Sequence, residues 1–227
     1  MEPSIIRELI RIHSGFISEN RRLQLEKVLA HRTRHITVVL EDIFQPHNAS
    51  AVLRSCDCFG IQDVHIIENT NEFTVSPKVA LGAAKWLNLY KYNNKQNNTL
   101  QAISTLKKEG YRIVATSPHT NETSLNAFDI KGKFALFFGT ELTGLSDQVM
   151  ENADEFLRIP IQGFAESLNI SVSAAICLYT LTQKLEESCM GYKLTQNEAE
   201  TIMLDWLRKT VKSWKSIENR FFKEINQ

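Results

Sequence analysis

The sequence predicts an α/β fold with a mostly parallel sheet flanked by helices. Short apolar runs typical of buried strands alternate along the chain with segments whose apolar residues recur every three or four positions. Proline and glycine also stand where several helices are expected to begin and end. With 227 residues, of which 43% are hydrophobic, the chain can fill one sizeable core.

The first part of the chain supplies two helices, one strand and a third helix. The amphipathic patterns "SIIRELIRIH" and "NRRLQLEKVLAHR" predict the two helices, and "HITVVLED" predicts a buried strand. The segment "QPHNASAVLRSCDCFG" then predicts a helix that begins at Pro46 and ends at Gly60. The apolar face of this helix consists of residues three or four positions apart: Ala49, Val52, Leu53, Cys56 and Phe59.

The alternation continues to residue 187. Strands are expected at "VHIIE", "LNLYKY", "YRIVATS", "KFALFFG" and "EFLRIPI". Helices are expected at "SPKVALGAAKW", "TLQAISTLKKEG" and "LSDQVMENA", followed by a long helix from Leu168 to about Glu187. The segment "TQNEAETIMLDWLRKTVKSWKSIENRFF" adds one or two C-terminal helices. We therefore expect a central domain over residues 36–187, with helical extensions over residues 1–35 and 188–227.

Four loops are the expected places for chemistry, because ligands of such sheets bind outside the carboxyl ends of the strands. These loops cover residues 41–48, 116–121, 139–145 and 160–168. Familiar motifs do not fit them. In "GTELTG" the glycines are spaced as in a phosphate-binding loop, but Leu145 stands where lysine should follow. No G-x-G-x-x-G follows the first strand, and H-E-x-x-H and G-x-S-x-G are absent.

Cysteine usage and hydropathy indicate a cytoplasmic protein without a metal site. The pair Cys56 and Cys58 lacks metal-ligand spacing, and we expect these two residues, together with Cys177 and Cys189, to be reduced and mostly buried. No apolar run approaches the roughly 20 residues that a membrane helix needs. The charged N-terminus does not resemble a signal peptide.

The charges are unevenly placed although they cancel over the whole chain. Residues 1–35 hold seven basic and four acidic residues, residues 207–227 hold six and two, and the stretch between them holds 13 and 20. Basic ends around an acidic body suggest that the ends meet a polyanion. The alternative is that these charges only form solvated helix faces.

Three segments resemble motifs of a known family. They are "VVLEDIFQPHNASAVLRSCDCFGI" (motif 1), "FALFFGTELTGLS" (motif 2) and "IPIQGFAESLNISVSAAICLY" (motif 3). In order and spacing they resemble the TrmH (SpoU) family of the SPOUT superfamily, whose members are RNA ribose 2′-O-methyltransferases that use S-adenosyl-L-methionine. The likeness covers roughly residues 36–187. The form "PHN-SA-LR-CD" is most similar to the branch that methylates guanosine 18 in the D-loop of tRNA.

The resemblance implies a C-terminal deep trefoil knot and a homodimer with the active site near the subunit interface. It implies these catalytic residues: Arg54, Asn48, Glu141, Ser167 and Asn169. Glu141 would order Asn48 and Arg54. Arg54 would activate the ribose hydroxyl, either as the base or by gripping a phosphate and stabilising the alkoxide; because arginine normally stays protonated, we favour the second role. The local alternative is that Ser167 and Asn169 only cap a helix.

The expected cofactor site is a set of close backbone turns with apolar walls. The residues that would contact S-adenosyl-L-methionine are Thr116, Gly139, Ile159, Ile161 and Leu168. Gly139, Gly144 and Gly163 would permit tight turns or left-handed backbone. No metal is required by this chemistry.

The expected RNA-binding residues lie at the start of the third helix and in the two extensions: His47, Arg7, Arg11, Lys209, Lys212 and Lys215. The last three approximate one helical face. The alternative is that this helix only supports the dimer.

The sequence thus predicts methyl transfer to a ribose 2′-hydroxyl of tRNA. One alternative is a ribosomal RNA methyltransferase of the same family, and another is a non-catalytic RNA-binding module. Ribosomal RNA methyltransferases of this family often carry a separate N-terminal RNA-binding domain. The 35 residues before the first strand are too few for such a domain, which favours tRNA over ribosomal RNA.

Overall fold

The computed structural model describes residues 1–94, 97–117 and 123–225. Within these residues the chain forms two compact units. The larger unit spans Thr33 to Tyr192, and the smaller one combines residues 1–32 with the chain from Lys193 onward. Part of the expected loop 116–121, residues 118–121, lies outside the described residues.

The larger unit is built on a parallel sheet, as the sequence predicts. In the described residues the sheet has seven strands in the order β3-β2-β1-β6-β4-β7-β5, and neighbouring strands pair in parallel. The strands are β1 (Ile36–Glu41), β2 (Asp63–Ile67), β3 (Asn88–Tyr92), β4 (Arg112–Thr116), β5 (Thr123–Ser124), β6 (Phe134–Phe138) and β7 (Glu155–Arg158). The short strand β5 was not expected from the sequence.

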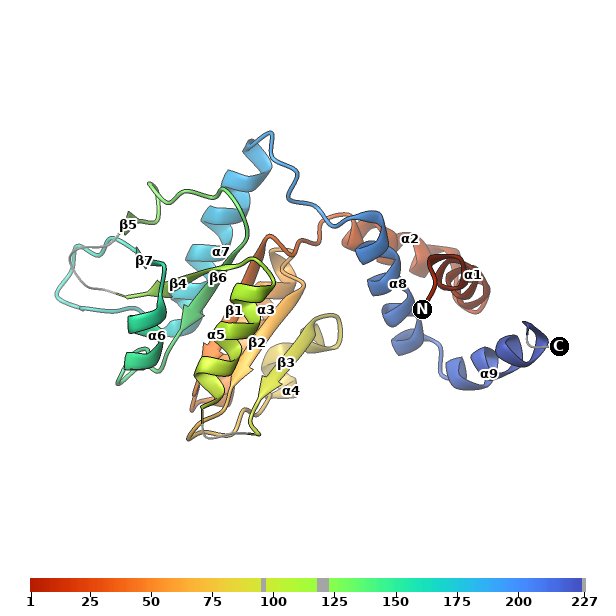
Figure 1. The fold of residues 1–227 in the computed structure, drawn as a ribbon, viewed down its shortest axis with the longest axis horizontal. Helices are drawn as coiled ribbons and strands as arrows, with labels where there is room; N and C mark the ends of the chain where they lie inside the picture. The colour runs from red at the N-terminus through yellow and green to blue at the C-terminus, as the bar shows by residue number, and fades with distance from the viewer. Residues whose placement is uncertain (95–96, 118–122, 226–227) are drawn as a thin grey trace. The chain divides into compact units, whose positions relative to one another are not determined.

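Helices cover both faces of this sheet (Figure 1). Side chains at alternate strand positions point to opposite faces, so Val38 and Leu40 pack in the core of one face and Val39 in that of the other. The first face is covered by α3 (Pro46–Cys58) and α7 (Ile170–Glu187), and the second by α5 (Asn98–Lys108) and α6 (Asp147–Asn152). Because both faces are buried, the strands read as continuous apolar runs rather than as alternating ones.

Two helices differ from the expectation. The segment "SPKVALGAAKW" is not one helix but α4 (Pro77–Ala80) and the 3₁₀ turn η1 (Ala83–Lys85). Between them Leu81 and Gly82 have φ angles of 46° and 82°, which are left-handed and end the first helix. The long helix begins at Ile170 rather than Leu168, because Asn169 is its N-cap and accepts a hydrogen bond from the Ser171 N–H.

The order of the strands brings the predicted loops to one edge. Strand β6 lies between β1 and β4, and β7 lies beside β4. The loops that follow these four strands therefore leave from neighbouring positions at the carboxyl end of the sheet. The loops after β1, β6 and β7 belong to motifs 1, 2 and 3, respectively.

The smaller unit contains both ends of the chain. Helices α1 (Pro3–Ser14) and α2 (Glu19–Leu29) belong to it together with α8 (Gln196–Thr210) and α9 (Trp214–Ile225). Leu9 and Leu204 pack in its core. A buried ion network joins three of the helices: Glu218 accepts two hydrogen bonds from the Arg208 guanidinium, at 2.7 and 2.9 Å, and lies 3.1 Å from His13 Nε2.

The smaller unit corrects one expectation about the lysines. Lys209, Lys212 and Lys215 do not share a helical face, because α8 ends at Thr210 and α9 begins at Trp214. Lys209 lies on the first helix, Lys212 on the connection and Lys215 on the second helix.

Candidate active site

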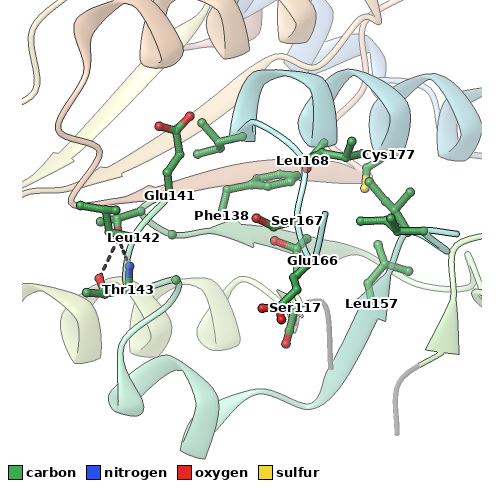
Figure 2. Close-up of a pocket in the computed structure, with 18 residues that line it drawn as sticks. Ser117, Phe138, Glu141, Leu142, Thr143, Leu157, Glu166, Ser167, Leu168 and Cys177 are labelled. Atoms are coloured by element: carbon green, nitrogen blue, oxygen red, sulfur yellow. Dashed lines mark hydrogen bonds between the residues drawn. The ribbon is translucent and has the colours of Figure 1, made fainter. Parts of the chain in front are cut away.

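A cavity of about 360 Å³ opens at the carboxyl ends of β4, β6 and β7 (Figure 2). The loop after β6, the loop after β7 and the first turns of α7 complete its walls. The residues that line it are Thr116, Ser117, Phe138, Gly139, Thr140, Glu141, Leu142, Thr143, Gly144, Leu157, Ile159, Ile161, Glu166, Ser167, Leu168, Ile170, Ser173 and Cys177. Its lining thus combines an apolar floor with hydroxyl and carboxylate groups.

The loop after β6 needs glycine at two positions. A Cβ atom on Gly139 would lie 2.2 Å from the carbonyl oxygen of Gly144, which is closer than any side chain allows. Gly144 itself has a φ of 70°. Thr140 and Gly144 exchange backbone hydrogen bonds of 2.9 and 3.1 Å, so the loop closes on itself.

The expectation for Gly163 is wrong. Its φ is not in the left-handed region, and a Cβ atom there would lie 4.0 Å from the Ala165 backbone nitrogen, at ordinary contact distance. Other residues would therefore fit at this position without backbone strain and without a steric clash of the Cβ atom.

All five residues expected to hold the cofactor line this one cavity: Thr116, Gly139, Ile159, Ile161 and Leu168. The hydroxyl of Thr116 donates to the Phe137 carbonyl at 2.7 Å, so this side chain ties the end of β4 to β6. Sequence reasoning missed Phe138 and Leu157, which also line the cavity. Both stand at the ends of apolar runs, and periodicity alone assigns such residues to the core.

Cys177 lies at the floor of the cavity as an unreactive thiol. Burial raises the pKa of Cys177 to about 12. The group therefore stays protonated at neutral pH and is a poor nucleophile. The expectation that the cysteines are mostly buried holds for Cys56 and Cys177 but is wrong for Cys58 and Cys189, which are exposed.

Asn48, Glu141 and Asn169, one from each motif, meet in a hydrogen-bonded cluster. Glu141 Oε1 accepts from Asn48 Nδ2 at 2.7 Å and from Asn169 Nδ2 at 2.6 Å. Asn169 Nδ2 also lies 3.2 Å from Asn48 Oδ1. Figure 2 shows the Glu141 carboxylate pointing away from Glu166 and Ser117. The backbone of Glu141 thus belongs to the cavity wall while its side chain ties motif 1 to motif 3.

Asn169 has two functions at once. Its Oδ1 accepts from the Ser171 N–H at 2.9 Å and from the Ser171 hydroxyl at 2.6 Å, which caps α7. Its amide nitrogen meanwhile donates into the cluster with Glu141. The local expectation of a helix cap and the expectation of a site residue are therefore both compatible with this geometry.

The remaining predicted catalytic residues stand apart from the cluster. Arg54 is exposed on α3, opposite the buried Val52 and Leu53, and makes no hydrogen bond or ion pair with a described residue. The expected contact between Glu141 and Arg54 is thus absent from the described part of the chain. Ser167 is exposed and lines the cavity, and His47 is exposed in the first turn of α3.

The predicted RNA-binding cations differ in their surroundings. Arg7 lies 4.0 Å from Glu200, Arg11 pairs with Glu8 at 2.5 Å, and Lys209 pairs with Asp205 at 2.5 Å. Lys212 and Lys215 are exposed and form no ion pair with any residue that the structure describes. The Lys215 ammonium does lie over the Trp214 ring, 5.6 Å from its centroid.

In residues 1–94, 97–117 and 123–225, no group of three or more His, Cys, Asp or Glu side chains could hold a metal ion. In the same residues no helix has both the length and the apolar character needed to cross a membrane.

The chain is similar in sequence to known RNA methyltransferases. The chain is 43% identical to the tRNA (guanosine(18)-2′-O)-methyltransferase of Borreliella burgdorferi, over 96% of this chain and 98% of the relative. It is 32% identical to the 23S rRNA (guanosine-2′-O-)-methyltransferase RlmB of Coxiella burnetii, over 77% and 71% of the two chains.

A solved structure shows a similar fold. The TrmH/SpoU tRNA modifying enzyme of A. aeolicus superposes with a TM-score of 0.76 at 29% identity, covering 85% of this chain and 98% of that one. The sequence model of the SpoU rRNA Methylase family matches residues 35–179, which contain all three motifs. The chain belongs to the SpoU methylase family.

Proposed function

We propose that this chain transfers a methyl group from S-adenosyl-L-methionine to the 2′-hydroxyl of guanosine 18 in tRNA. The observation that carries the proposal is the cluster of Asn48, Glu141 and Asn169 beside the cavity. It joins the three family motifs at one point, and the 43% identical relative that spans nearly the whole chain is named for this reaction.

The cavity fits the nucleoside part of this cofactor. Its volume of about 360 Å³ falls in the usual range of small-molecule sites. Gly139 and Gly144 bring backbone close to the ligand, and Ile159 and Leu168 offer an apolar wall for a purine ring. When bound, S-adenosyl-L-methionine supplies a methyl group on a positively charged sulfur.

The catalytic residues then have to hold and activate the ribose hydroxyl. The transfer forms an oxygen–carbon bond, breaks the sulfur–carbon bond and releases the hydroxyl proton. Arg54 remains protonated, binds the phosphate next to the ribose and stabilises the developing alkoxide. The hydroxyl proton leaves to water with the assistance of that phosphate. Asn48 and Asn169, held by Glu141, orient the ribose, and Ser167 lies at the cavity for contact with the same nucleotide.

The proposed architecture extends these assignments. Residues 36–187 form the catalytic domain with a deep trefoil knot, and residues 1–35 and 188–227 form helical extensions. The division of the chain into two compact units, with both extensions in the smaller one, supports a boundary between the catalytic domain and the extensions. Family membership supports the knot.

The proposed assembly is a homodimer in the cytoplasm, with the active site near the subunit interface. Large apolar side chains are exposed close to the site in the sequence, among them Phe44 at 74% and Phe164 at 109% relative exposure. Burial in a second copy would remove these side chains from water. Sedimentation of the full chain tests the dimer directly, since a monomer at micromolar concentration contradicts it.

Two other functions compete with this proposal. The Coxiella burnetii relative named for 23S rRNA supports a ribosomal substrate. The second alternative, an RNA-binding module without catalysis, predicts no cofactor binding. Incubation with labelled S-adenosyl-L-methionine, total tRNA and total rRNA separates the three. We expect label in tRNA; label in rRNA alone favours the first alternative, and absence of both label and cofactor binding by calorimetry favours the second.

A further inference from the structure

We propose that Glu41 is a positioning residue that holds the motif 2 loop, residues 139–146, against the cofactor cavity. The proposal rests on the assignment of that cavity to S-adenosyl-L-methionine. Glu41 is the last residue of β1 and is only 2% exposed. A carboxylate buried to this extent is costly unless its oxygens are hydrogen-bonded, so its partners show what it does.

Those partners lie on two different elements. Glu41 Oε1 accepts from the Thr99 hydroxyl and from the Ser146 hydroxyl, each at 2.7 Å. Glu41 Oε2 accepts from the Ser146 backbone N–H at 2.9 Å. Thr99 belongs to α5, whereas Ser146 ends the motif 2 loop and is the N-cap of α6. One buried side chain therefore fixes the end of the loop through two bonds.

The other end of the same loop is also fixed by β1. Phe138, the last residue of β6, pairs with Leu40 in the sheet, and Gly139 follows it. Leu40 and Glu41 are consecutive, so neighbouring residues of one strand hold the start and the end of the loop. Between these ends the bonds between Thr140 and Gly144 close the chain on itself. A shift at Ser146 is thus passed to the residues that line the cavity.

Within the loop, apolar packing is limited to Leu145, which is half-buried against the core of the second sheet face. Leu142 is 97% exposed, and Glu141, Thr143 and Gly144 are exposed as well. A second cavity of about 340 Å³ is lined by Glu41 and Ser146 and shares Thr140, Thr143 and Gly144 with the first. Because the loop is a thin wall between two cavities, its position depends on hydrogen bonds more than on apolar contacts.

The chemistry of the site predicts which replacements are tolerated. The Ser146 N–H can only donate, whereas the two hydroxyls can donate or accept. In Glu41→Gln the amide oxygen can face the N–H while the amide nitrogen faces the hydroxyls. In Glu41→Leu the N–H and both hydroxyls lose their acceptor at similar side-chain volume. We therefore expect the glutamine variant to rescue the position of the loop.

The decisive comparison uses two variants, each of which removes one of the hydroxyl groups that donate to Glu41. Ser146→Ala removes one of the two bonds on the loop side and leaves the bond from the Ser146 backbone N–H. Thr99→Val removes the bond on the α5 side. We expect Ser146→Ala to weaken S-adenosyl-L-methionine binding by about threefold and Glu41→Leu by about tenfold, because they release the loop. Thr99→Val and Glu41→Gln should stay within about twofold of the parent chain.

The measurement is the dissociation constant by calorimetry, with the thermal midpoint of each variant taken alongside. Similar affinity losses in Ser146→Ala and Thr99→Val, or no loss in Ser146→Ala, overturn the proposal, because Glu41 then contributes only to stability. If Glu41→Leu does not fold, the two hydroxyl variants still decide. Leu168→Asp places a charge against the cavity wall and tests the site assignment separately: unchanged affinity in that variant shows that the cavity is not the cofactor site.

Discussion

Asn48 and Asn169 lie 121 positions apart in the chain, yet their side chains are 3.2 Å apart and donate to the same carboxylate oxygen of Glu141. The two amides therefore depend on one acceptor for their orientation. Glu141 is exposed, so its carboxylate is available to organise the site without the large cost of burying a charge.

The first prediction is that Glu141 acts through these amides. Glu141→Gln keeps one acceptor oxygen and should lower kcat about tenfold, whereas Glu141→Ala removes the acceptor and should lower it about a hundredfold or more. Steady-state methyl transfer to a tRNA transcript measures both. Equal activity in the alanine variant and the parent chain would falsify the role of the cluster.

The second prediction separates catalysis from cofactor binding. Arg54 is exposed and does not line the cavity, so Arg54→Ala should remove nearly all methyl transfer and leave cofactor affinity within about threefold. Arg54→Lys keeps the charge but lacks the planar fork of donors, and should restore only a small part of the rate. Near-normal turnover in Arg54→Ala would contradict a role for Arg54 in activating the ribose hydroxyl.

The third prediction concerns the unpaired lysines of the smaller unit. Replacing both Lys212 and Lys215 by glutamine should weaken tRNA binding and reduce its salt dependence, because about one counterion is released for each phosphate contact. Lys209→Gln is the matched control, since Lys209 pairs with Asp205 and should contribute less. Binding measured at several salt concentrations gives the slope. An unchanged slope in the folded double variant moves the RNA surface to the region of His47 and Arg54.

The fourth prediction concerns stability in mild acid. His65 is buried and its ring stacks with those of Tyr90 and Tyr92, with Nδ1 2.9 Å from the Tyr92 hydroxyl; burial lowers the pKa of His65 to about 4. Between about pH 6.5 and pH 4 the unfolded chain binds a proton at this residue and the folded chain does not, so stability falls as pH falls. Through His65 alone, the free energy of unfolding should be about 2 kcal/mol lower at pH 5 than at pH 7.

Urea unfolding of the parent chain and of His65→Gln at the two pH values measures this contribution. The variant is less stable at both, but it should lose about 2 kcal/mol less on acidification than the parent. Equal losses in the two chains would mean that His65 is protonated in the folded state near its ordinary pKa.

The sequence predicts the order of the elements well because the strands are short, apolar and separated by helical patterns. The continuous run in β1 and the proline at the start of α3 are local signals, and the structure confirms both. The split between α4 and η1 is not indicated by the apolar periodicity of the segment. It depends on the left-handed turn at Leu81 and Gly82, and the segment is held to α3 by a 2.8 Å bond from the Ser76 N–H to the Ser50 hydroxyl.

In the site, too, some features are predicted by sequence patterns and others are not. Motif spacing identifies Asn48, Glu141 and Asn169 as candidates, and the fold brings them together. Burial of a charge cannot be predicted in this way: Glu41 follows an apolar strand and reads as the first residue of a solvated loop, yet it lies in the interior. The lysines also show the limit, since three-residue spacing predicts a shared face only if the helix is continuous.

The attacking hydroxyl gives the most direct test of the central claim. A tRNA transcript carrying 2′-deoxyguanosine at position 18 lacks only the oxygen that the proposed reaction methylates. With labelled S-adenosyl-L-methionine, we expect full labelling of the ordinary transcript and none of the deoxy transcript, while both bind the protein with the same affinity. Equal labelling of the two transcripts would contradict it, because the methyl group would then be going to another atom.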